Sequence, residues 1–123
     1  MTVAEGPEVA AHLGGLESIW DEGMRDAYAF YGVRAGQEVA LAAAMVEAAL
    51  DLQHLGATAP DPARLLLGDL CLARASRLLA ATRDTHLQIG FARAVERVAA
   101  AAAGGPPARP LRELLTAAIG EAG

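Results

Sequence analysis

Residues 65–81 read LLLGDLCLARASRLLAA, and this stretch decides the fold of the chain. Leucine and alanine dominate it and no proline interrupts it, which is typical of an α-helix that packs against other helices. Asp61 and Pro62 stand just upstream as a helix start, because aspartate caps free amide groups and proline fits the first turn. We therefore expect one helix from Asp61 to about Thr82.

The remaining helices follow from the same periodicity, and no stretch of the chain alternates polar and apolar residues as a strand does. The predicted ranges are about Pro7 to Tyr31, Gln37 to Leu55, Asp84 to Ala103 and Pro110 to Ile119. Short links between helices favour antiparallel neighbours. The predicted fold is therefore all-α, an antiparallel bundle of four long helices plus a short C-terminal helix. Residues 1–123 make a single domain, in which 1–6 and 104–109 are expected to be flexible.

The first two predicted helices differ in how much apolar surface they carry. The first has one apolar stripe, made of Val9, Leu13, Leu16, Trp20, Met24, Ala27 and Tyr31. The second is apolar on most sides, so we expect it in the middle of the bundle.

Composition and charge restrict the possible partners. The net charge is −5, and the first 31 residues hold six acidic residues against one arginine. Such a chain offers nothing that attracts nucleic acid, and its acidic first helix faces either solvent or a basic partner. No apolar run approaches 18 residues, so no membrane span is predicted. Cys71 is the only cysteine, no disulfide is possible within the chain, and we expect a cytoplasmic protein.

A search for catalytic groups finds little. His12, His54 and His86 lie on different predicted helices, and none stands at metal-ligand spacing from another histidine or a cysteine. Glu47 and Asp51, one helical turn apart, are the nearest pair of carboxylates, and both are expected to face water or an arginine. No catalytic residue, metal ligand or cofactor site is therefore predicted.

The central stretch resembles a family signature. Gly68 and Asp69, followed by LARA at 72–75 and LLA at 78–80, are similar to the GDxLLARAxELLA signature of the trans-polyprenyl diphosphate synthases. Upstream, residues 47–55 read EAALDLQHL and resemble the family's preceding helix, with His54 in the histidine place. The aspartate-rich DDxxD motif that should follow is absent, and so is the GGKRxRP diphosphate-binding motif.

The resemblance implies a protein without chemistry of its own. Synthases of this family ionise an allylic diphosphate, whose charge is stabilised by magnesium ions bound to clustered aspartates. The chain therefore resembles the small, non-catalytic subunits of heteromeric hexaprenyl and heptaprenyl diphosphate synthases, with a truncated isoprenoid-synthase-like bundle as the implied fold. Its implied partner in isoprenoid biosynthesis is a catalytic polyprenyl synthase subunit, to which it adds a dimer interface and an apolar tunnel wall.

The same resemblance assigns that interface to the helices that start at Asp61 and Asp84. The residues implied are Gly68, Asp69, Leu72, Ala73, Ala75, Ser76, Leu79, Leu87, Phe91 and Val95. Two other hypotheses stay open. One is a homodimeric helical interaction protein without a prenyl substrate, in which the chain pairs with itself. The other is a small enzyme with a site around Glu47, Asp51 and His54.

Overall fold

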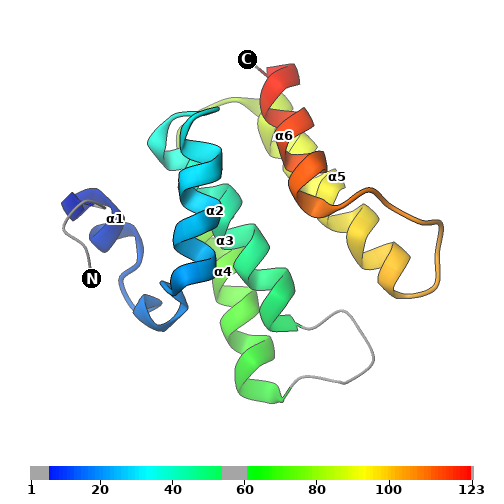
Figure 1. Cartoon of the computed structure of the whole chain (residues 1–123), viewed down its shortest axis with the longest axis horizontal. Coiled ribbons are helices and arrows are strands. Elements are labelled where there is room, and N and C mark those ends of the chain that lie inside the picture. The colour runs from blue at the N-terminus through cyan, green and yellow to red at the C-terminus, as the bar shows by residue number, and fades with distance from the viewer. Residues whose placement is uncertain (1–5, 54–60, 123) are drawn as a thin grey trace.

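The computed structural model describes residues 6–53 and 61–122, and Figure 1 shows their arrangement. Neither of these two ranges contains a strand. Their helices are α1 (Gly6–His12), the short 3-10 helix η2 (Glu17–Ile19), α2 (Glu22–Gly32), α3 (Gln37–Gln53), α4 (Pro62–Ala81), α5 (Thr85–Ala102) and α6 (Leu111–Ala122). The all-α class is confirmed. None of the described helices is long and apolar enough to cross a membrane.

The prediction of one helix from Pro7 to Tyr31 is wrong, because α1, η2 and α2 occupy this region. Gly15 adopts a φ of +84°, a left-handed conformation that glycine tolerates and that ends the helical path. A new helix then begins at Asp21, whose carboxylate accepts a hydrogen bond from the Met24 amide at 2.8 Å. The predicted apolar stripe still points inward, since all its members except the partly buried Trp20 are buried.

Helix α3 is the centre of the fold. It packs against α2 on one side and α4 on the other, and neighbouring helices from α2 to α6 run in alternating directions (Figure 1). Every residue from Ala40 to Val46 is buried. Most of these residues are alanines, whose small side chains let neighbouring backbones approach. The central position predicted for this helix is thus confirmed.

A glycine sets the contact between α3 and α4. A Cβ atom at Gly68 would lie 2.7 Å from Gln53 Cγ and 3.1 Å from the Ala49 carbonyl oxygen, so no larger residue fits without movement. The Gln53 amide also donates a hydrogen bond of 2.8 Å to Asp69 Oδ1 across the same contact. The start of α4 is as predicted, because Asp61 Oδ1 accepts from the Arg64 amide at 2.9 Å.

Helices α5 and α6 form an antiparallel hairpin beside this layer (Figure 1). Asp84 begins α5 as predicted, and its carboxylate accepts from the Leu87 amide at 3.0 Å. At Gly90 the two helices come so close that a Cβ atom would lie 2.8 Å from Ala118 Cβ. Of the segments expected to be flexible, residues 1–5 lie outside the described ranges, Gly6 begins α1, and 104–109 lie in the loop that joins the two helices.

Candidate functional site

The structure brings part of the predicted interface together in one apolar groove between α4 and α5. The groove has a volume of about 240 Å³ and includes six of the implied interface residues: Leu72, Ala75, Ser76, Leu79, Phe91 and Val95. Val46 of the central helix α3 also lines it. Residues that the sequence places on two separate helices therefore share one surface.

The other four implied interface residues lie elsewhere. Gly68 and Leu87 are buried, and Asp69 is bound by Gln53, so these three take part in packing or hydrogen bonding within the chain. Ala73 is exposed on α4. Whether a partner contacts any of them stays a prediction.

The signature arginine also has a role within the chain. Arg74 Nη1 donates a hydrogen bond of 2.6 Å to the His12 carbonyl oxygen, and Nη2 donates one of 3.0 Å to the Gly14 carbonyl oxygen. These bonds satisfy carbonyl groups at the end of α1 that lack partners in their own helix. Arg74 therefore fastens α1 to α4.

Exposed leucines on the outer side of α4 were not predicted from the sequence. Leu66 and Leu70, one turn apart, are 60% and 45% exposed, and Leu65 beside them is 42% exposed. The opposite side of the same helix is buried through Cys71, Ala75 and Leu78. A helix that is apolar on two sides can contact a neighbour on both of them. The leucines on both sides of α4 were the sequence signal for a second contact surface.

A polar cluster joins α2, α3 and α6. The Tyr31 hydroxyl, fully buried, donates a hydrogen bond of 2.5 Å to Glu47 Oε2. Arg112 binds the same carboxylate through two of its nitrogens. Nε donates a hydrogen bond of 2.9 Å to Oε2, and Nη2 donates one of 3.0 Å to Oε1. Its Nη1 lies 3.5 Å from Asp26 Oδ2. This cluster fastens the C-terminal helix to the centre of the fold.

The electrostatics of the cluster favour the charged pair and a neutral phenol. Burial, and then the hydrogen bond to Glu47, raise the pKa of Tyr31 well above its usual range. The hydrogen bond to Glu47 raises the pKa of Arg112 as well. Both oxygens of Glu47 are therefore engaged in structural contacts, as expected for a carboxylate that faces an arginine. Asp51 is exposed, and His54, the third residue of the hypothetical enzyme site, lies outside the described residues.

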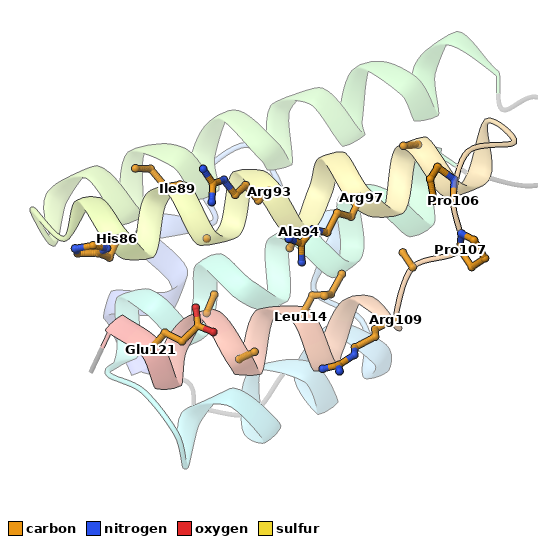
Figure 2. A pocket seen from close by; sticks show the side chains of 15 residues that line it. His86, Ile89, Arg93, Ala94, Arg97, Pro106, Pro107, Arg109, Leu114 and Glu121 are labelled. Atoms are coloured by element: carbon orange, nitrogen blue, oxygen red, sulfur yellow. The ribbon is translucent and has the colours of Figure 1, made fainter.

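A larger, open cleft of about 850 Å³ lies between α5 and α6 (Figure 2). Its walls include His86, Ile89, Arg93 and Arg97 of α5, Pro106, Pro107 and Arg109 of the connecting loop, and Leu114 and Glu121 of α6. Among the described residues, none of its three arginines has a carboxylate oxygen within 4 Å, since both such ion pairs involve Arg112. The one-turn spacing of Arg93 and Arg97 was a sequence signal for this cleft.

No cluster of metal-binding side chains occurs in the described ranges. Residues 6–53 and 61–122 contain no group of three or more histidine, cysteine, aspartate or glutamate side chains that could hold a metal ion. Comparison of the chain with protein-family models, curated proteins and solved structures gave no match. The relationship to polyprenyl diphosphate synthases therefore stays a prediction from the signature on α4.

The buried thiol of Cys71 makes the free energy of unfolding depend on pH in the alkaline range. Burial raises its pKa to about 11, although the nearby Arg74 lowers it in part. The unfolded thiol loses its proton near pH 8.5, so between roughly pH 8.5 and 11 the folded state holds more protons and stability falls as pH rises. Tyr31 adds a loss of the same sign above about pH 10. Urea unfolding between pH 7 and 10.5 should show this decline, with a shallower slope for Cys71→Ala. Equal slopes would contradict the assignment to the thiol.

Proposed function

We propose that this chain is a non-catalytic helical subunit that binds a polyprenyl diphosphate synthase through its α4–α5 face. The α4–α5 face has two parts: the exposed leucines Leu65, Leu66 and Leu70 of α4, and, further along the same helix, the groove between α4 and α5. The observation that carries the proposal is the exposure of three large apolar side chains on the helix that bears the family-like signature. Apolar surface concentrated in this way is typical of a protein-binding site.

The division of labour follows from the residues of each partner. The synthase supplies the aspartates that bind magnesium and diphosphate, while this chain supplies an interface and part of an apolar tunnel wall. The engagement of both Glu47 oxygens by Tyr31 and Arg112 supports a non-catalytic role, because the best-placed carboxylate of α3 is already used. We further propose that the chain folds as a truncated, antiparallel isoprenoid-synthase-like bundle and works in the cytoplasm.

Co-expression tests the proposal with two carboxylates placed at the exposed leucines of the α4–α5 face. The chain is expressed together with a tagged synthase that carries the DDxxD motif and comes from the same genome. We expect a stable complex with the native chain and at least 100-fold weaker binding with Leu66→Glu/Leu70→Glu, because two carboxylates would be buried against apolar surface. Co-purification and the chain length of the prenyl product are the measurements.

Val33→Glu is the matched control, because it removes an exposed apolar side chain just after α2 instead of on α4. It should leave the complex and the product length unchanged. Absence of any complex with the native chain, or equal binding by the double variant, would contradict the proposal.

A second copy of the chain is the alternative occupant of the α4–α5 face. Leu66 and Leu70 are followed one turn later by the small, exposed Ala73, so two α4 helices related by a two-fold axis can approach closely. A symmetric dimer that Leu66→Glu/Leu70→Glu disrupts, and that ignores the synthase, would favour a homodimeric interaction protein without a prenyl substrate.

A further inference from the structure

The cleft between α5 and α6 carries positive charge that the described parts of the chain do not neutralise. Arg93 and Arg97 stand one turn apart on α5, and Arg109 adds a third guanidinium from the loop (Figure 2). Like charges at this spacing slightly destabilise their own helix. Glu121 is the one acidic residue among those that line the cleft. An acidic partner would relieve the repulsion between the arginines.

A surface of opposite charge lies on α2 of the same molecule. Glu22 and Asp26 are both exposed and also stand one turn apart, and Ala29 and Val33 continue the same side of the helix. Val33 is 81% exposed, the most of any large apolar residue in the described ranges. We call the side formed by Glu22, Asp26, Ala29 and Val33 the acidic face.

We propose that the α5–α6 cleft binds the acidic face of a second copy of this chain. In an antiparallel alignment Glu22 meets Arg97 and Asp26 meets Arg93, because both pairs have the same one-turn spacing. In the same register Val33 lies opposite His86 at the other end of the cleft, one turn from the exposed Ile89. The lengths agree, since α2 spans about 16 Å and the stretch of α5 that lines the cleft about 20 Å at ~1.5 Å per residue.

The arrangement of the helices lets each chain of a dimer place its acidic face in the other chain's cleft at the same time. Arg112 near the start of α6 reaches α2 and α3, whereas Leu114 and Glu121 of the same helix line the cleft, so α6 lies between the two surfaces. Two chains that meet across a two-fold axis along α6 therefore bring each acidic face to the other's cleft. Figure 1 supports the alignment, because the start of α2 and the end of α5 lie at the same end of the molecule.

The internal contact of Asp26 does not block this pairing. Its carboxylate lies 3.5 Å from Arg112, but the side chain remains 74% exposed and has a second oxygen free to accept. The contact is independent of the α4–α5 face, since neither the cleft nor the acidic face includes the exposed leucines of α4.

Sedimentation equilibrium of the full chain at 50 mM and 500 mM NaCl tests the proposal. We expect reversible self-association at low salt that weakens at least tenfold at high salt, because exposed ion pairs are screened. Two variants should each lose it at 50 mM NaCl: Arg93→Glu/Arg97→Glu, and Glu22→Arg/Asp26→Arg. An equimolar mixture of the two should associate again, because both contacts then pair opposite charges.

Two controls separate this contact from general charge effects and from the α4–α5 face. Arg77→Glu/Arg83→Glu lowers the net charge by the same amount as Arg93→Glu/Arg97→Glu and should associate like the native chain. Leu66→Glu/Leu70→Glu should also associate like the native chain. A native chain that stays monomeric at 50 mM NaCl would overturn the proposal, even if the cleft bound citrate or inorganic phosphate instead. Failure of the mixed variants to associate would overturn it as well.

Discussion

Replacing Glu47 by alanine is expected to lower the free energy of unfolding by about 3 kcal/mol. The change removes the acceptor for the buried Tyr31 hydroxyl and for two donors of Arg112. Truncating one partner of this partly buried ion pair leaves the guanidinium of Arg112 without its main partner. The expected loss lies at the lower end of the usual range because Arg112 retains some exposure. Urea denaturation followed by circular dichroism measures the change.

Asp51→Ala is the matched control, because this carboxylate lies one turn further along α3 and is exposed. Its effect should stay within about 0.5 kcal/mol. Tyr31→Phe should lower the free energy of unfolding by an intermediate amount, about 1.5 kcal/mol. It removes one hydrogen bond to a charged group and leaves the hydrogen bonds from Arg112 to Glu47 intact. If Glu47→Ala costs no more than Asp51→Ala, the cluster does not fasten α6 to the centre of the fold.

Replacing Gly68 by leucine is expected to cost about 3 kcal/mol, even though leucine is the better helix former. The side chain would have to displace Gln53 and push against the Ala49 carbonyl oxygen, which belongs to the backbone of α3 and cannot rotate away. The separation of α3 and α4 would increase, and the hydrogen bond between Gln53 and Asp69 would be lost. Thermal unfolding reports the loss.

Gly120→Leu provides the comparison, because a Cβ atom there meets nothing within 4 Å. This substitution within α6 should leave stability unchanged or raise it by up to about 1 kcal/mol. Equal effects at the two positions would mean that the close contact between α3 and α4 is not what selects glycine at position 68.

Local chemistry made several features of the fold predictable. Asp61 and Asp84 begin helices because their carboxylates satisfy amide groups only a few residues away, so nothing distant is needed to place them. The central position of α3 was predictable for a related reason. A helix that is apolar on most of its sides can bury them only among other helices.

Features that depend on distant contacts were not predictable. The apolar stripe from Val9 to Tyr31 keeps a helical spacing across Gly15, so its periodicity concealed the break that the left-handed glycine introduces. Glu47 and Arg112 are 65 positions apart, and no local pattern marks them as partners. The outer side of α4 is exposed only because α3 covers the opposite one, so the exposed leucines emerged from the tertiary arrangement.

Amide hydrogen exchange of the chain, alone and with the synthase, tests the binding role of the α4–α5 face most directly. Proximity of a partner slows exchange where backbone opening is suppressed. We expect slower exchange on binding along α4 from Leu66 to Leu79 and along α5 from Gln88 to Val95, with α2 unchanged. Unaltered exchange in those two stretches, or protection confined to α2 and α6, would contradict it.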